Sequence, residues 1–411
     1  MSFNPADYGQ AVLLTGLIPS GSETGFEAVI TKDNLPTSAL DGGLLSCLNG
    51  GGDWALATDI KGINQLPLEI VTCVTNAVPA NTEFESYTRF PTYASGSRSA
   101  YAFWNRAGQS QPIPSAAFGS EAVWQDNESA WHLDDLTDSA GNATSLTTVG
   151  SPTTVDGVVG DGKRFASNPD YLYTSTVGVV ENDSFNISFW YKRQTGDELS
   201  NGTAIGIADN SSPFGNYGIE LSKDDATDTL ILSAFSRDID NNADEIMRLS
   251  GVLEGDSVFI SLNQSSTGTS GFGIHAGSVQ SGTSTRRLFG TTPDRLSFNR
   301  LMDSSPNAGS LMVLDEIRLT SAGNTKSSDR AELEYDNQSN PATFWTAGTV
   351  FVPGGSPLQI TPLTINSSSI ALNPIVTFEQ SQKIGNITAS FADDLYSVKY
   401  KLSAITVNFK G

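Results

Sequence analysis

Short runs of alternating apolar and polar residues, separated by turn-forming residues, are the feature that most constrains this fold. In the run 185–192, Phe185, Ile187 and Phe189 fall on one face if the backbone is extended. Gly, Ser, Thr and Asn are abundant between such runs, and long heptad-like repeats are absent. The sequence therefore predicts an all-β fold of antiparallel β-sandwich domains.

The chain is long enough for two or three domains. We predict a β-sandwich over residues 1–120, a jelly roll over 121–349 and a small β unit over 350–411. A unit of roughly 60 residues buries little surface by itself. We therefore expect the C-terminal unit to dock on another domain or another subunit.

The charge of the chain is strongly acidic and unevenly spread. The formal net charge is −22, of which residues 121–349 carry −18. Phosphates would be repelled and no basic stripe compensates, which argues against nucleic acid as a partner and disfavours anionic membranes. A solvated acidic surface is the simpler interpretation, and cation binding is the alternative.

Neither targeting nor membrane insertion is indicated by the sequence. Residues 1–7 lack a basic region followed by an apolar one, and the sequence has no run of 18 apolar residues. We therefore expect no signal peptide and no membrane span.

The two cysteines, Cys47 and Cys73, are expected to be buried free thiols. A disulfide is the alternative, because sequence alone does not show whether the two are close.

Two families share ordered motifs with this chain. The first segment resembles DUF2341 domains at residues 41–43, 65–71, 101–105 and 118–124. The second resembles a laminin-G/concanavalin A-like jelly roll at residues 121–134, 138–142, 160–165, 185–192 and 314–319, closing with 329–346. Such modules occur in phage tail and adhesin-like proteins and usually bind surfaces and glycans. The resemblance thus implies adhesion rather than catalysis.

The jelly-roll resemblance also implies a calcium site at the rim of the sandwich. Its candidate ligands are Asp134, Asp138 and Asp315, because calcium takes several oxygen ligands from short acidic loops. The alternative is that these carboxylates accept hydrogen bonds from backbone N–H groups of turns.

Aromatic side chains in turn-rich segments are the candidates for glycan binding, since the C–H faces of sugars stack on rings. They are Tyr171, Tyr173, Phe214 and Tyr217. Trp131, Trp190 and Trp345 lie in more apolar surroundings, and we expect these three in cores.

No catalytic residues are predicted. Glu332, Glu334 and Asp336 would share one face of a strand, as in jelly-roll glucanases. However, Asp329 and Glu332 have capping-box spacing, which predicts a short helix over 331–337 that ends before Pro341. At helical spacing the carboxylates do not converge, so a solvated helix face is expected. The sequence contains no zinc spacing, nucleophile elbow or phosphate-binding loop, and His132 is expected to be structural.

Together these features predict a non-enzymatic virion structural protein of a tailed phage, associated with the tail tip, fibre or baseplate. Its lectin-like module would contact host-surface glycan or other virion proteins. It would be assembled in the host cytoplasm, act outside the cell and be oligomeric within the particle. Calcium is the one cofactor considered. The alternatives are a secreted bacterial carbohydrate-binding adhesin, a capsid decoration protein and a jelly-roll glycosidase.

Overall fold

The computed structural model describes residues 3–142, 145–166, 170–175, 184–193, 202–208, 216–224, 229–237, 243–265, 267–285, 295–299 and 312–353. They belong to one compact unit, Met1–Pro353. The described strands pair in antiparallel sheets with a few short helices, which confirms the predicted all-β class. No helix in these ranges is long and apolar enough to cross a membrane. The predicted C-terminal unit lies outside the described residues from 354 onward.

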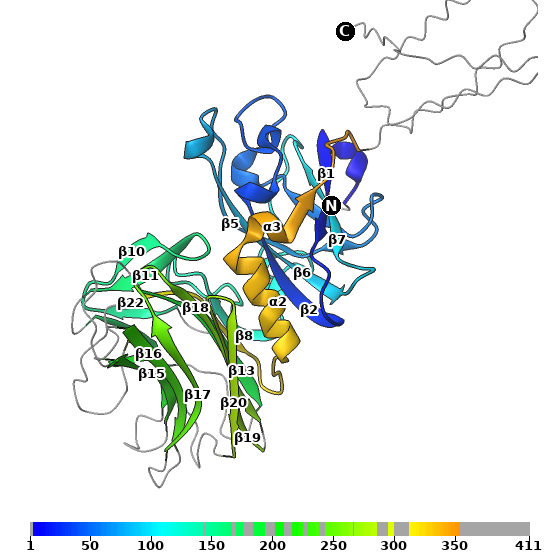
Figure 1. Ribbon diagram of the computed structural model, residues 1–411. Helices are drawn as coiled ribbons and strands as arrows, with labels where there is room; N and C mark the ends of the chain where they lie inside the picture. The colour runs from blue at the N-terminus through cyan, green and yellow to red at the C-terminus, as the bar shows by residue number, and fades with distance from the viewer. Residues whose placement is uncertain are drawn as a thin grey trace, which may run out of the picture. The chain divides into compact units, whose positions relative to one another are not determined.

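The N-terminal sandwich, blue to cyan in Figure 1, packs a five-stranded sheet against a three-stranded one. The strand orders are β23-β1-β7-β3-β4 and β2-β6-β5. The strands are β1 (Gln10–Gly16), β2 (Glu23–Thr31), β3 (Ala55–Ala57), β4 (Gln65–Leu66), β5 (Leu68–Val74), β6 (Glu83–Tyr93), β7 (Ser99–Trp104) and β23 (Trp345–Ala347). Short 3₁₀ helices lie between them: η1 (Pro5–Asp7), η2 (Lys32–Asn34), η3 (Thr37–Ala39), η4 (Asn49–Gly51) and η5 (Pro79–Asn81).

The core of this sandwich follows the alternation of its strands. Val12 and Leu14 of β1 face Phe26 and Ala28 of β2, and all four side chains are fully buried. Apolar burial of this kind is the main stabilising contribution to such a sandwich.

The two cysteines lie side by side at the edge of the same core. Both are free thiols, as predicted, although Cys73 is only half-buried. The Sγ atoms of Cys47 and Cys73 are 3.3 Å apart.

The second sandwich, green in Figure 1, contains an eight-stranded and a seven-stranded sheet. The first runs β10-β11-β22-β13-β18-β19-β20, with β8 paired to β22, and the second runs β17-β16-β15-β14-β21-β12-β9. The strands are β8 (Asn127–Trp131), β9 (Thr147–Val149), β10 (Thr153–Asp156), β11 (Asp161–Phe165), β12 (Tyr171–Thr174), β13 (Phe185–Lys192), β14 (Gly202–Ala208), β15 (Asn216–Asp224), β16 (Thr229–Arg237), β17 (Ala243–Val252), β18 (Ser257–Ser265), β19 (Gly268–His275), β20 (Ser278–Ser284), β21 (Arg295–Phe298) and β22 (Met312–Thr320). Helix α1 (Ser120–Val123) precedes β8.

Strand β13 shows that both faces of the larger sheet are covered. Phe185, Ile187 and Phe189 point into the sandwich core, as the alternation predicts. The opposite face is also buried, because Trp190 donates a hydrogen bond from Nε1 to Gln338 Oε1 of helix α2 at 2.6 Å. A strand inside a sheet covered on both sides is buried all round.

Helix α2 (Ser328–Ser339) begins earlier and ends later than the predicted range 331–337. Its N-cap is Ser327, whose hydroxyl accepts from Arg330 N, so the predicted cap at Asp329 is wrong by two positions. Asn340 ends α2, and Pro341 opens helix α3 (Pro341–Phe344). In Figure 1, α2 lies between the two sandwiches.

The segment from α2 to β23 returns to the N-terminal sandwich and covers the edge of β2. The Asn337 side chain accepts from Val29 N at 2.7 Å and donates to Val29 O at 3.0 Å, as a neighbouring strand would. Trp345 Nε1 donates to the same carbonyl at 2.8 Å. These bonds occupy an edge that would otherwise be open to pairing with another chain. The motif 329–346 therefore covers an edge of the N-terminal sandwich. It lies within the range 121–349 that was predicted for the second domain.

Candidate functional site

Two of the predicted glycan-binding residues form a pair on the outside of the second sandwich. Tyr171 and Tyr173 alternate with the buried Leu172 along β12, so both rings lie on the outer face of the sheet. Each of the two residues is half-buried there. Their ring centroids are 5.9 Å apart with 36° between the planes. The hydrogen-bonding register places Tyr173 opposite the exposed Thr147 and Tyr171 opposite Val149.

The other aromatic predictions have different outcomes. Phe214 lies outside the described residues, and of Tyr217 only the backbone, in β15, is described. The three tryptophans predicted as core residues, Trp131, Trp190 and Trp345, are all at most 3% exposed.

The three predicted calcium ligands do not come together in one cluster within the described part of the chain. Asp138 accepts from the backbone N–H groups of Ala130 and Asn142, and the exposed Asp134 accepts from Asp135 N. The fully buried Asp315 accepts from the backbone N–H groups of residues 158 and 159 through Oδ2 at 2.7 and 2.9 Å. All three carboxylates thus cap backbone donors.

The carboxylates of α2 do not share one face. Glu332 is exposed, but Glu334 is fully buried, so the prediction of a solvated face is wrong for Glu334. Glu334 Oε1 accepts from Arg330 Nε at 2.7 Å, and its Oε2 lies 2.9 Å from Lys326 Nζ. The Arg330 guanidinium also pairs with Glu27 of β2. This α2 charge cluster, Glu27, Lys326, Arg330 and Glu334, joins the helix to the N-terminal sandwich.

Burial and charge act in opposite directions on Glu334. Burial alone would raise the pKa of this carboxyl, but the adjacent Lys326 and Arg330 lower the pKa to about 2. Burial also lowers the pKa of Lys326, against the attraction of Glu334. Glu334 therefore remains ionised at every physiological pH.

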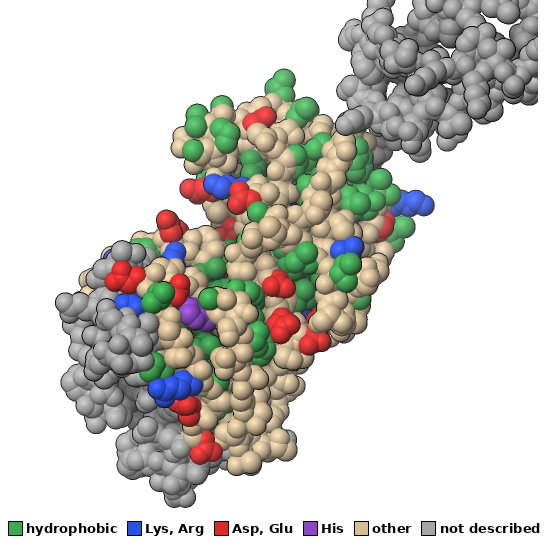
Figure 2. Space-filling model, viewed as in Figure 1, with side chains coloured by type: hydrophobic (Ala, Val, Ile, Leu, Met, Phe, Trp, Pro, Cys, Tyr) green, Lys and Arg blue, Asp and Glu red, His purple; other side chains and the backbone are tan. Residues whose placement is uncertain are grey.

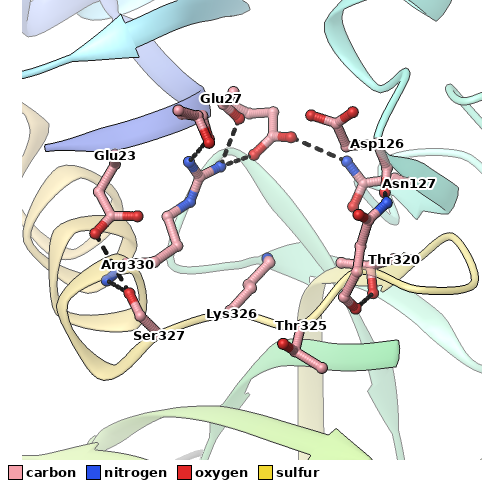
Figure 3. A pocket seen from close by; sticks show the side chains of 12 residues that line it. Glu23, Glu27, Asp126, Asn127, Thr320, Thr325, Lys326, Ser327 and Arg330 are labelled. Carbon is pink, nitrogen blue, oxygen red and sulfur yellow. Dashed lines mark hydrogen bonds and ion pairs between the residues drawn. The ribbon is translucent and has the colours of Figure 1, made fainter. Parts of the chain in front are cut away.

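A polar pocket of about 250 Å³ opens beside the α2 charge cluster. Its walls come from β2, from the turn before β8 and from the segment that leads into α2 (Figure 3). Arg330 lies on one side and is bonded to Glu27, while Glu27 accepts from Asn127 across the top of the view at 3.1 Å. The Lys326 side chain extends towards the centre. The charged groups mostly bind one another, so the pocket is part of the junction between the sandwiches.

A second buried cluster lies in the junction and was not predicted. His132, which follows β8, has Nδ1 2.8 Å from Glu316 Oε1 and Nε2 3.2 Å from Glu69 Oε2. The other carboxylate oxygen of Glu316 accepts from Arg318 at 2.8 Å. Glu85 of β6 contributes a further buried carboxylate close to His132 and Glu316. We call these five residues the His132 cluster.

The charges in the His132 cluster set its protonation. Burial would lower the pKa of His132, but Glu316 and Glu69 raise it well above its ordinary value. Burial likewise opposes ionisation of Glu316, yet His132 and Arg318 lower its pKa to about 2. Burial and the charge of Glu316 together raise the pKa of Glu85 to about 8.

A β-bulge in β22 brings the charged groups of this strand to one face. Leu314 and Ile317 both point into the sandwich core, although strict alternation would send Glu316 there instead. The backbone of Glu316 has φ +50°, and the register with β13 shifts at this point. The side chains of Asp315, Glu316 and Arg318 therefore all point away from the sandwich core and towards the junction. A non-glycine residue in this conformation is strained and is common at functional sites.

The sequence contained one signal for this cluster. Asp315 and Glu316 are adjacent polar residues between Leu314 and Ile317, so they interrupt the alternation of the strand as one extra residue in a bulge does. Their partners His132, Glu69 and Glu85 come from distant segments, and no spacing rule links them.

The molecular surface shows no dominant charged patch on the face drawn in Figure 2, where acidic and basic side chains are interspersed. Among the described residues, most of the exposed large hydrophobic ones belong to the first 118 positions, for example Ile18, Leu44, Ile63 and Ile113.

Comparison with solved structures finds similar β-rich domains at low similarity. Domain 4 of the extracellular arabinanase AbnA from Geobacillus stearothermophilus, in complex with arabinotriose, has a TM-score of 0.37 at 17% identity, covering 51% of this chain and 98% of that one. The botulinum neurotoxin serotype D binding domain has a TM-score of 0.38 at 12% identity, covering 52% of each chain. The enzymatically active domain of bacteriophage CBA120 tailspike protein 2 has a TM-score of 0.35 at 14% identity, covering 46% of this chain and 30% of that one.

These similarities assign neither a family nor a ligand at such scores. No protein-family model matches the chain, and no curated protein does. The resemblance to DUF2341 and laminin-G-like domains therefore stays a prediction.

Proposed function

We propose that this chain is a non-enzymatic structural protein of a tailed-phage virion, near the tail tip, fibre or baseplate, and that it contacts a host-surface glycan. The observation that carries the glycan part is the Tyr171–Tyr173 pair on the outer face of β12. The virion part is supported by the sequence resemblance to modules of phage tail and adhesin-like proteins.

The tyrosine pair suits a saccharide because it presents apolar ring faces next to polar groups. The strand fixes both backbones, so little ordering of the protein opposes binding. The half-buried rings offer stacking surface for sugar C–H groups. Thr147, opposite Tyr173, adds a hydroxyl at the same place.

A binding role rather than hydrolysis is supported by the helix α2 carboxylates. A glycosidase needs two carboxyl groups facing one another across a groove. Glu334 is buried in ion pairs with Lys326 and Arg330, whereas Glu332 is exposed on another side of the helix.

We expect the double substitution Y171A/Y173A to weaken glycan binding by about tenfold or more, the factor that ~1.4 kcal/mol of lost contact energy produces. The matched control is Y171F/Y173F, which keeps both rings and should retain most of the affinity. Binding is measured on immobilised host polysaccharide, and the melting temperature of each variant confirms that it is folded.

Equal binding by the wild type and the alanine variant would show that Tyr171 and Tyr173 do not bind the glycan. Release of sugars from the polysaccharide, abolished by a Glu→Gln substitution, would overturn the non-enzymatic proposal in favour of a glycosidase.

The virion assignment predicts that the protein co-purifies with phage particles at a fixed stoichiometry through density-gradient centrifugation. Immunogold labelling should mark the tail. Labelling confined to the envelope of uninfected bacteria would instead support an adhesin, and labelling over the capsid would support a decoration protein.

A further inference from the structure

We propose that Glu85, His132 and Glu316 bind a divalent transition-metal ion, with zinc as the best fit, at the junction of the two sandwiches. One carboxylate oxygen of each glutamate and one ring nitrogen of His132 all lie within 4.8 Å of one another. The three side chains come from β6, from the residue after β8 and from β22. The ion would therefore link the N-terminal sandwich to the second one, independently of the glycan site.

The spacing of the three donor atoms suits a shared ion. Two ligands at 2.0–2.2 Å from zinc in a tetrahedral site are separated by roughly 3.4 Å. The distance from His132 Nδ1 to Glu316 Oε1 is 2.8 Å, and the remaining separations stay below 4.8 Å. Side-chain shifts of up to about 1 Å would bring the more widely separated donor atoms to coordination distances.

An unpartnered carboxylate oxygen points to a missing ligand. Glu85 is 4% exposed, and its Oε1 has no hydrogen-bond partner among the described residues. Buried polar atoms are nearly always bonded, so an exception calls for an ion or a water. A second such atom, Oδ1 of the neighbouring Asp315, is also buried and unpartnered within the described part of the chain.

The surrounding residues provide the outer contacts that metal sites need. Glu69 bonds His132 Nε2, which is the carboxylate–histidine–metal arrangement that fixes the orientation of the ring. Arg318 bonds the Glu316 oxygen that faces away from His132, and the His132 ring is stacked on Tyr87 with 4.6 Å between centroids. The ligands are thus held in place before any ion arrives.

The local backbone is also adapted to this cluster. Gly160 has φ +57°, and a Cβ atom there would lie 2.0 Å from Glu85 Oε2, so a larger residue would have to displace this carboxylate. The bulge that turns Glu316 out of the core of the second sandwich supplies the other carboxylate.

The charge balance and the donor types select the kind of ion. Four carboxyl groups, the buried Glu85, Asp315 and Glu316 and the partly buried Glu69, outnumber the two basic groups, His132 and Arg318, so a cation could bind here in place of protons. An imidazole nitrogen among the donors favours zinc over calcium or magnesium, which prefer oxygen ligands only.

The test uses the full chain without a histidine tag, because this chain has only two histidines. We expect about one zinc per chain by elemental analysis after loading and dialysis, and a saturable rise in melting temperature with zinc that calcium and magnesium do not reproduce. Glu85→Gln should abolish retention of the ion, and Glu69→Gln should weaken zinc affinity by about 10–100-fold. Co²⁺ loading should give visible absorption bands in the wild type that Glu85→Gln lacks.

His275→Gln is the matched control, since this residue is paired with Asp256 in another part of the second sandwich and should leave zinc retention unchanged. Retention of less than about one tenth of an ion per chain by the wild type, or equal retention by wild type and Glu85→Gln, would overturn the proposal. Glu85→Gln preserves side-chain shape, so it separates the loss of a ligand from misfolding. Tyr171 and Tyr173 are not involved, so failure of either proposal leaves the other intact.

Discussion

Replacing Arg330 by methionine is expected to lower the free energy of unfolding by about 3–5 kcal/mol, the usual cost of breaking a buried ion pair from one side. Arg330 is 6% exposed, and its guanidinium forms ion pairs with Glu27 and Glu334. It also donates a hydrogen bond to the carbonyl of residue 25 at 2.9 Å. Methionine keeps the aliphatic stem but leaves Glu27 buried without its cation. Urea denaturation monitored by tryptophan fluorescence measures the change in the free energy of unfolding. Calorimetry shows whether the two sandwiches unfold together.

The matched control is Arg248→Met, because Arg248 pairs with Glu245 on the surface, where both side chains are about half exposed. Such pairs contribute about 0–1 kcal/mol. The double variant R330M/E27Q should recover part of the stability, since it removes the carboxylate left behind. Similar losses for R330M and R248M would show that the α2 charge cluster does not hold the helix in place.

Strand positions and cores could be predicted because they depend on local pattern. The side chains of Phe185, Ile187 and Phe189 follow the two-residue period of a strand, and all three are buried in the core of the second sandwich. Tyr171 and Tyr173 were predicted in a turn-rich segment, but they lie on strand β12, where residues two apart share a face.

The junction between the sandwiches could not be predicted in the same way. Its charged residues come from segments up to 303 positions apart, as with Glu27 and Arg330, and no local pattern encodes their pairing. The helical spacing of Glu332, Glu334 and Asp336 predicted a solvated face, but only Glu332 and Asp336 are exposed. Its burial arises only because α2 is covered by both sandwiches, which is a property of the tertiary structure.

The β22 bulge illustrates how a local rule fails at such a place. Strict alternation would put Glu316 in the core of the second sandwich, and the chain avoids this by adopting φ +50° at that residue. The strain is offset by the bonds of Glu316 to His132 and Arg318. The exception to the pattern therefore lies where the unpredicted cluster is found.

Acidification is expected to remove about 3 kcal/mol of stability through Glu334 alone. Its pKa falls from the ordinary 4.5 to about 2 in the folded chain, because Lys326 and Arg330 outweigh the effect of burial. A group whose pKa is lowered by folding stabilises the protein above its unfolded pKa, so this contribution is complete above about pH 4.5 and is lost towards pH 2. The 2.5-unit difference corresponds to ~3 kcal/mol, of which ~2 kcal/mol is lost by pH 3.

The measurement compares unfolding free energies of the wild type, E334Q and E332Q at pH 6 and pH 3. E334Q lacks the titrating group, so the stability gap between it and the wild type should shrink by ~2 kcal/mol at the lower pH. E332Q, on the exposed side of the same helix, should follow the wild type at both pH values, since its charge is solvated. Because each comparison is made at one pH, the general effect of neutralising an acidic chain cancels. A gap that stays constant between pH 6 and pH 3 would mean that Glu334 is not held ionised by Lys326 and Arg330, and that the helix is anchored by its apolar contacts and by Asn337.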